Sequence, residues 1–202
     1  MNYQEIQQLV NLPECKIVMS NTLNKYDLPL EKFMTVSEIS YCNQLNTTHQ
    51  QNQFKTIRRL RTTSLGLYEI KYMNYGAPYL TEQNTNISIS HKNNYVVLGF
   101  SPYKIGIDLE KISERIKKVK SKFLTEQEIN EFSDETDEIY TQLWAAKEAI
   151  YKTIAPPISF KNDIILTKGD NGLIIGKIFD NEKSINLNFL NIKDYILCYV
   201  LL

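Results

Sequence analysis

The sequence predicts an α+β protein in which helices pack on antiparallel sheets, and two patterns support this prediction. Apolar residues recur at helical spacing in the first 72 residues, for example at Phe54, Ile57 and Leu67. After Ile87, short apolar or alternating runs separated by turn residues indicate strands. Hydrophobic residues make up 43% of the 202 residues and charged residues 23%, which is ordinary for a globular protein and excludes the fibrous and disordered classes.

The first part of the chain is expected to be rich in helices. Apolar periodicity predicts helices from Tyr3 to Val10, from about Leu30 to Leu45 and from about Gln51 to Tyr72. Gly76 and Pro78 then interrupt the helical pattern, because both residues favour turns.

Three strands are expected in the middle of the chain, at Ile87 to Ser90, Tyr95 to Phe100 and Ile105 to Glu110. The third alternates strictly between apolar and other residues. Successive side chains of a strand point to opposite faces, so Asp108 and Glu110 project side by side from one face.

The rest of the chain is predicted to place helices beside an antiparallel sheet. Thr125 and Glu128 match a capping box at the start of one helix, and a stronger helix from about Ile139 must end before Pro156. Four short strands follow, at Ile164 to Thr167, Leu173 to Ile178, Ile185 to Leu190 and Tyr195 to Leu201.

Charge and cysteine content narrow the environment and the partners. Basic and acidic residues both number 23, so no overall charge favours nucleic acid or a membrane as a partner. Cys15, Cys42 and Cys198 are widely spaced and lack a CxxC pair, and no basic region followed by an apolar run opens the chain. We therefore expect a cytoplasmic protein with reduced thiols. A local basic run is expected to form a solvated helix face; it contains Lys111, Arg115, Lys117, Lys118, Lys120 and Lys122.

Five side chains are candidates for chemistry. Asp108 and Glu110 repel each other when ionised, and a cation would relieve the repulsion, although an isolated pair of this kind is more often an exposed strand face. Glu148 and Lys152, four residues apart on a helix, form either a simple salt bridge or a carboxylate for Mg²⁺ beside an ammonium for phosphate. His91 follows a strand and could face a cleft, and nothing indicates a zinc site.

Three segments in order resemble the motifs of the 4'-phosphopantetheinyl transferase superfamily. They are Ile89-Ser90-His91, Gly106-Ile107-Asp108-Leu109-Glu110 and Trp144-Ala145-Ala146-Lys147-Glu148-Ala149-Ile150-Tyr151-Lys152. Gly76-Ala77-Pro78-Tyr79 resembles a fourth element, G-K-P-Y, in which Ala77 stands where relatives often have lysine, and Lys92 follows His91 where serine is usual. The resemblance is clear from about Gly76 to Lys152.

Length and motif position resemble those of the longer, monomeric type that activates surfactin synthetase. This implies two similar α/β halves related by a pseudo-twofold axis, with coenzyme A between them. Residues 1–103 would form the helix-rich half on the side of the coenzyme A 3'-phosphate. Residues 104–202 would form the half with the magnesium site and the catalytic helix.

The resemblance also implies an activity and its residues. The 4'-phosphopantetheine group of coenzyme A would be transferred to a serine of an apo carrier protein, releasing adenosine 3',5'-bisphosphate. Asp108, Glu110 and Glu148 would bind Mg²⁺, Lys152 would contact the pyrophosphate, and either Glu148 or a metal-bound water would accept the serine proton. Asp108, Glu148 and Lys152 would thus be catalytic. Coenzyme A would be bound by Ser90, His91, Lys152 and an arginine from Arg58, Arg59 and Arg61, of which Arg61 is our candidate.

Other readings of the same residues remain. The basic run could speed encounter with acidic carrier proteins instead of being only solvated. A non-catalytic relative that binds coenzyme A or a carrier is an alternative, although the chain keeps all three acidic residues. A different Mg²⁺-dependent phosphoryl-transfer enzyme is a third option, which the lack of a G-x-x-x-x-G-K-[ST] loop disfavours.

Overall fold

The structure is a computed structural model that describes residues 6–22, 29–133, 135–155, 157–169, 173–179 and 184–202. The chain divides into two compact units, Met1–Tyr103 (unit 1) and Lys104–Leu202 (unit 2). Both units combine helices with antiparallel sheets, so the predicted α+β class is confirmed. No helix within the described ranges is long and apolar enough to cross a membrane.

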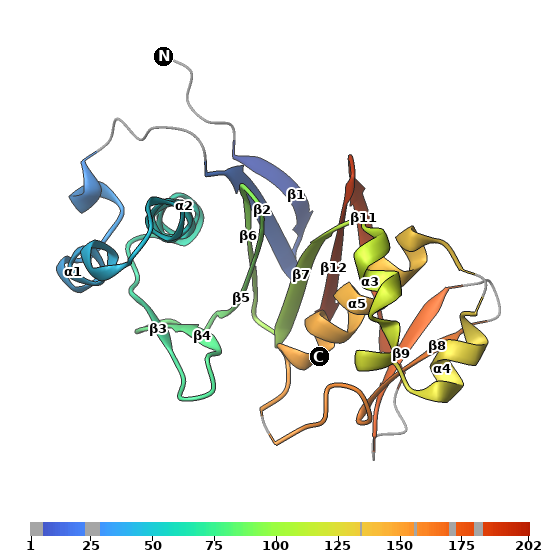
Figure 1. Ribbon diagram of the computed structural model, residues 1–202. Coiled ribbons are helices and arrows are strands. Elements are labelled where there is room, and N and C mark those ends of the chain that lie inside the picture. Colours follow the sequence, from blue (N-terminus) through green and yellow to red (C-terminus); the bar gives the residue numbers. More distant parts are fainter. Residues whose placement is uncertain (1–5, 23–28, 134, 156, 170–172, 180–183) are drawn as a thin grey trace. The chain divides into compact units, whose positions relative to one another are not determined.

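Unit 1 is built on a four-stranded antiparallel sheet (Figure 1). Its order is β1-β2-β6-β5, and the strands are β1 (Gln7–Leu12), β2 (Cys15–Asn21), β6 (Tyr95–Ser101) and β5 (Asn86–Lys92). A separate pair of short antiparallel strands consists of β3 (Ile70–Tyr72) and β4 (Pro78–Leu80).

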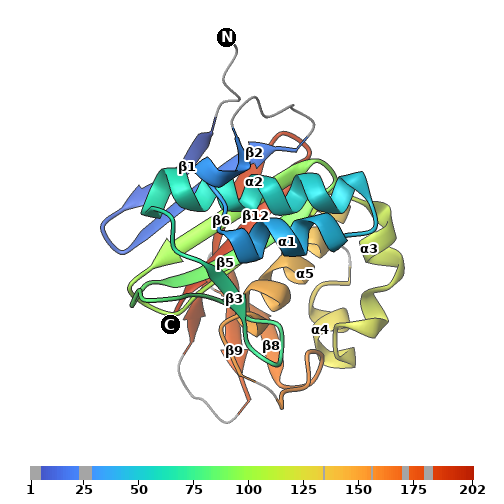
Figure 2. The ribbon, with the colours of Figure 1, turned by 90° about the vertical axis from the view of Figure 1, so that its left-hand side faces the viewer.

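Two helices lie side by side in unit 1, as Figures 1 and 2 both show. The shorter, α1 (Val36–Gln44), follows the 3₁₀ turn η1 (Leu30–Lys32), and the longer is α2 (Thr48–Leu65). The apolar stripe of α2 packs on the sheet, where Ile57 and Leu60 share a buried cluster with Val96, Leu98 and other strand residues. α2 therefore covers one face of the sheet.

The sequence patterns misplace several elements of unit 1. Tyr3 to Glu5 lie outside the described residues, but Gln7–Leu12 is a strand and not the second half of a helix. β1 buries only Val10 and has a register shift between Gln8 and Val10, so its apolar residues do not alternate as a strand pattern should. Tertiary pairing with β2, which the patterns did not predict, decides its conformation.

The boundaries of the other two predicted helices also change. Thr35 caps α1 in a complete capping box, so the stretch from Leu30 to Leu45 is a 3₁₀ turn and a separate helix. α2 ends at Leu65 because Gly66 adopts φ 108°, a conformation that glycine tolerates and most residues do not. The predicted end of this helix at Tyr72 is therefore wrong, and residues 70–72 form β3.

Unit 2 contains two three-stranded antiparallel sheets. One has the order β11-β12-β7 and consists of β11 (Asn188–Ile192), β12 (Tyr195–Leu201) and β7 (Ile105–Lys111). The other has the order β10-β9-β8 and consists of β10 (Ile185–Asn186), β9 (Ile174–Ile178) and β8 (Ile164–Lys168). These strands agree with the four predicted C-terminal runs, except that the run from Ile185 is split in two.

The helices of unit 2 are α3 (Glu114–Lys118), the 3₁₀ turn η2 (Lys120–Lys122), α4 (Glu126–Glu131) and α5 (Asp137–Tyr151). The predicted capping box of Thr125 and Glu128 is present at α4. α5 is the central helix: Ala146, Ala149 and Ile150 are fully buried against residues of both sheets, including Cys198 and Leu166. It lies along β7 and β12 in Figure 1.

Candidate functional site

The motif residues of unit 2 lie where β7 meets α5. Gly106 makes this close approach possible, because a Cβ atom there would lie 1.9 Å from the backbone oxygen of Ala149 on α5. Even-numbered residues of β7 share the face of Gly106, so the side chain of Asp108 projects from the same face toward the end of α5. The glycine of the motif therefore positions the carboxylates that follow it.

An ion pair connects the strand to the helix end. The Nζ atom of Lys152 lies 2.8 Å from Oδ1 of Asp108 and also donates to the backbone oxygen of Ile107 at 2.9 Å. Glu148 lies one helical turn before Lys152, so both side chains are on one face of the helix. The structure thus brings Asp108 and Lys152, which are 44 residues apart in the sequence, into direct contact.

The pKa of Glu148 depends on its burial and on the charges of its neighbours. Burial raises the pKa of the Glu148 carboxyl group, and the negative charges of Asp108 and Glu110 raise it further, while Lys152 opposes them. The three carboxyl groups are therefore close enough to interact electrostatically. Glu148 is therefore harder to ionise than an isolated glutamate, and a bound dication would relieve the repulsion from its neighbours.

Cys198 is a neighbour that sequence patterns did not identify. It is the cross-strand partner of Asp108 in the β7–β12 ladder and is fully buried. Burial raises the pKa of its thiol well above the usual value, and the charge of Asp108 adds to this effect while Lys152 opposes it. The thiol is therefore an inert packing group beneath the carboxylates.

Lys147 and Glu148 are adjacent in the motif but point in different directions. Lys147 is fully buried, its Nζ lies 2.9 Å from Oε1 of Glu128, and it also donates to the backbone oxygen of Lys161. Glu128 also accepts a hydrogen bond from the backbone N–H of Leu166 on β8. Lys147 therefore connects α5 to α4 and, through Glu128, to β8.

The coenzyme A candidates Ser90, His91 and Arg61 all belong to unit 1. Ser90 and His91 are successive residues of β5, so their side chains point to opposite faces of the sheet. His91 is exposed, and its Nδ1 lies 3.3 Å from Nε2 of Gln53 on α2. It lines a cavity of about 170 Å³ together with residues of α1, α2 and β3, among them Gln53, Arg58 and Tyr72.

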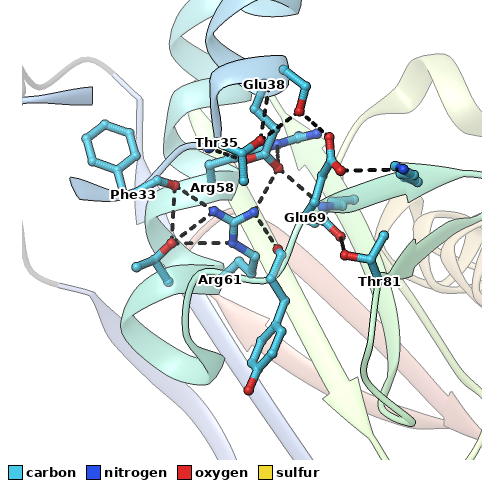
Figure 3. Close-up of polar contacts among 12 residues, drawn as sticks. Phe33, Thr35, Glu38, Arg58, Arg61, Glu69 and Thr81 are labelled. Atoms are coloured by element: carbon cyan, nitrogen blue, oxygen red, sulfur yellow. Dashed lines mark hydrogen bonds and ion pairs between the residues drawn. The ribbon is translucent and has the colours of Figure 1, made fainter. Parts of the chain in front are cut away.

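Arg61 is fully buried in a polar cluster that joins α1 to α2 (Figure 3). Its guanidinium donates to Oε1 of Glu38 at 2.7 Å and to the backbone oxygens of Tyr68 and Phe33, both at 2.6 Å. Arg58 donates to the same Glu38 oxygen at 3.1 Å. These contacts give Arg61 a structural role within unit 1, and a phosphate contact would require breaking them.

The donors for a metal ion are of a suitable kind, but they are not arranged as a closed site. Across the described parts of the chain, no three His, Cys, Asp or Glu side chains are grouped as metal ligands. Asp108, Glu110 and Glu148 nevertheless supply only oxygen donors, which hard cations such as Mg²⁺ prefer, and their mutual repulsion favours a cation. Lys152 already places a positive charge on one of these oxygens.

Comparison with known proteins supports the motif assignment. Residues 104–200 match the model of the 4'-phosphopantetheinyl transferase superfamily. The chain is 27% identical over 94 residues to 4'-phosphopantetheinyl transferase ffp of Bacillus subtilis, a match that covers 44% of this chain and 42% of the relative. It is 31% identical over 84 residues to 4'-phosphopantetheinyl transferase gsp of Aneurinibacillus migulanus, covering 40% and 35% respectively.

These matches cover less than half of either relative, and the family match coincides almost completely with unit 2. The matched region contains β7, α5 and the cluster formed by Asp108, Glu110, Glu148 and Lys152. Residues 104–200 of this chain are therefore a domain of the 4'-phosphopantetheinyl transferase superfamily.

Proposed function

We propose that this chain transfers the 4'-phosphopantetheine group of coenzyme A to a serine hydroxyl of an apo carrier protein, with adenosine 3',5'-bisphosphate as the other product. The observation that carries this proposal is the convergence of Asp108, Lys152 and Glu148 at the β7–α5 contact inside the family-matched region. Three carboxylates and an ammonium are the groups needed to hold Mg²⁺ and a pyrophosphate together.

In the proposed site, Asp108, Glu110 and Glu148 would hold Mg²⁺, and the ion would supply positive charge beside the pyrophosphate. Lys152 reaches past the end of α5 and orients the phosphate oxygens. Either Glu148 or a water molecule at the site would accept the proton of the attacking serine.

The 3'-phosphate end of coenzyme A is assigned to β5. Side chains alternate along β5, so His91 projects to one face and both Ser90 and Lys92 project to the other. We propose His91 for the 3'-phosphate contact, at the end of the strand, where the long side chain of Lys92, the last residue of β5, can also reach the phosphate. Lys92 is the nearest sequence neighbour that could supply a full positive charge. We also propose that the protein acts as a monomer in the cytoplasm. Its three free cysteines fit the reducing environment of that compartment.

The direct test combines purified protein, Mg²⁺, coenzyme A and several apo carrier proteins, followed by intact mass measurement of each carrier. A mass increase equal to one phosphopantetheine group on a carrier is the expected result. If every carrier keeps its apo mass while the protein still binds coenzyme A, the non-catalytic alternative is favoured instead.

Variants assign the residues. We expect Asp108→Ala and Glu148→Ala each to lower the transfer rate by roughly 100-fold or more, since each removes a charge placed for the transferring group. Glu114→Ala is the matched control, because Glu114 is an exposed carboxylate of the same unit that pairs with Lys118 four residues later. Full activity of Glu148→Ala would remove Glu148 from the mechanism.

A further inference from the structure

The ion pair between Lys152 and Asp108 lies where its ammonium group can reach solvent. Lys152 follows the last residue of α5, and its side chain is 27% exposed, so solvent reaches the ion pair from one side. Its second partner is the neutral backbone oxygen of Ile107. The ammonium side of this pair can therefore reach solvent, unlike the fully buried pair of Lys147 and Glu128.

The ion pair belongs to a group of three carboxyl residues. Asp108 and Glu110 share one face of β7, their charges act on Glu148 of α5, and Lys152 contacts Asp108. A divalent cation would reduce the repulsion among these carboxylates. The same cation would also repel the ammonium group, which lies 2.8 Å from one of the carboxylate oxygens that the cation needs.

We propose that Lys152 is a displaceable partner of Asp108: a divalent cation bound by the carboxylates takes over Oδ1 and releases the ammonium group to the phosphates of the donor. The inference rests on the proposed function, because it uses the same carboxylates as metal ligands. Lys152 thereby couples the two ligands of the site. It opposes metal binding while it remains on Asp108, and a phosphate group that attracts it strengthens metal binding.

The first test measures Mg²⁺ affinity by calorimetry without coenzyme A. Lys152→Met should bind Mg²⁺ roughly fivefold more tightly than the unmodified protein, because a competing charge at the edge of solvent is lost. Lys111→Met is the matched control: it removes a charge from β7, but Lys111 pairs with Asp194. Its Mg²⁺ affinity should stay within about twofold of that of the unmodified protein. Equal or weaker binding by Lys152→Met overturns the inference.

The second test uses the unmodified protein, so it does not depend on the folding of a variant. A water-soluble amine-acylating reagent is applied with and without Mg²⁺, and the modified lysines are quantified by peptide mass spectrometry. Mg²⁺ should increase acylation of Lys152, while Lys161, which donates to the backbone oxygen of Ser121, should be unaffected. Unchanged or reduced acylation of Lys152 overturns the inference.

Asp108→Ala separates this inference from the function on which it rests. If Asp108→Ala abolishes Mg²⁺ binding but Lys152→Met leaves it unchanged, the metal assignment stands and the displacement of Lys152 is wrong. If the unmodified protein and Asp108→Ala bind Mg²⁺ equally or not at all, both the metal assignment and the inference are wrong.

Discussion

Gly106 shows how a single missing side chain determines the geometry of the candidate site. A Cβ atom at this position would meet the backbone of α5 at 1.9 Å, and the Thr153 methyl group at 2.8 Å. Backbone atoms cannot rotate away as a side chain can. The distance between β7 and α5, and with it the reach of Lys152 to Asp108, therefore depends on this glycine.

Gly106→Ala is accordingly expected to destabilise the protein by roughly 2–4 kcal/mol, because α5 must move away from β7 and loosen its buried contacts. Urea denaturation measures the change. Gly76→Ala is a suitable control, because nothing lies within 4 Å of a Cβ atom there. Its cost is only the backbone strain of a positive φ of 88°, about 1 kcal/mol. Equal losses in the two variants would show that crowding at α5 is not the cause.

Glu38 gives unit 1 a pH-dependent contribution to stability. Burial alone would raise the pKa of its carboxyl group, but hydrogen bonds from the backbone N–H groups of Thr35 and Ile70 and the charge of Arg61 outweigh burial, so the pKa lies below its usual value. A carboxyl group with a lowered folded-state pKa stabilises the fold fully above its unfolded pKa of about 4.5. This stabilisation is lost as the pH falls through the folded-state pKa.

We therefore expect the difference in unfolding free energy between the unmodified protein and Glu38→Gln to be constant from pH 7 to about pH 5 and to shrink at lower pH. Urea denaturation at a series of pH values measures it. Glu126→Gln, a change at the start of α4 in unit 2, serves as a reference for a carboxyl group outside this cluster. A difference that grows as the pH falls would contradict the assignment.

At the scale of the element, α5 divides its charged residues between the interior and the site. Lys147 points into unit 2 and pairs with Glu128, whereas Glu148 and Lys152 face the carboxylates of β7. A helix turns by about 100° per residue, which is enough to send neighbouring residues to different surroundings. The buried pair fixes the rotation of the helix and so the direction in which Glu148 points.

Lys147→Met should cost roughly 3–5 kcal/mol of stability, because it leaves the buried Glu128 charge without its partner. Lys168→Met provides the contrast, since Lys168 pairs with Glu135 at side-chain exposures of 40% and 28%. Loss of such an exposed pair should cost less than about 1 kcal/mol. Both values come from denaturant unfolding, and similar costs for the two lysines would show that Glu128 is adequately satisfied without Lys147.

The alternation of β5 leads to a prediction about the donor. If His91 and Lys92 contact the 3'-phosphate, the double variant His91→Ala/Lys92→Ala should lower the affinity for coenzyme A far more than the affinity for dephospho-coenzyme A, which lacks that phosphate. Calorimetry with both ligands measures this. Ser90→Ala is the comparison, because Ser90 projects to the face opposite His91 and lies further from the end of the strand than Lys92 does. An equal loss of affinity for the two ligands in the double variant would exclude a 3'-phosphate contact.

At the scale of the whole molecule, each unit has apolar clusters formed by its own residues. Ala146, Ala149 and Ile150 belong to the cluster of unit 2, and Ile57 and Leu60 to one in unit 1. Proteins open in cooperative segments that often coincide with such clusters. Damage to one cluster is therefore expected to be felt most strongly in its own unit.

Hydrogen exchange of Lys147→Met tests this expectation. The amides of α5 and β12 should lose protection, while those of α2 and β6 should keep most of theirs. Mass spectrometry of peptic fragments resolves the two sets. An equal loss of protection in both units would show that the chain unfolds as a single cooperative unit.

Local patterns were sufficient where the chain follows a regular period. Strict alternation placed β7 and put Asp108 and Glu110 on one face, and the capping box placed the start of α4. The same patterns predict part of a helix at β1 because it buries a single side chain and shifts register, so its conformation is decided by pairing with β2. The end of α2 depends on the φ of Gly66, which glycine content alone does not specify.

The order and spacing of the three motifs, which the sequence holds by itself, were enough to assign the superfamily. The tertiary structure alone decided which charged residues are available to a ligand. Arg61 and Lys147 look like surface cations in the sequence, but both are fully buried and paired with glutamates. Lys152, in contrast, reaches Asp108 at the solvent edge. The physical reason is that a charge held by a partner in the interior cannot turn to a ligand, whereas one whose side chain reaches solvent can. Partners 19 to 44 residues away cannot be read from local spacing.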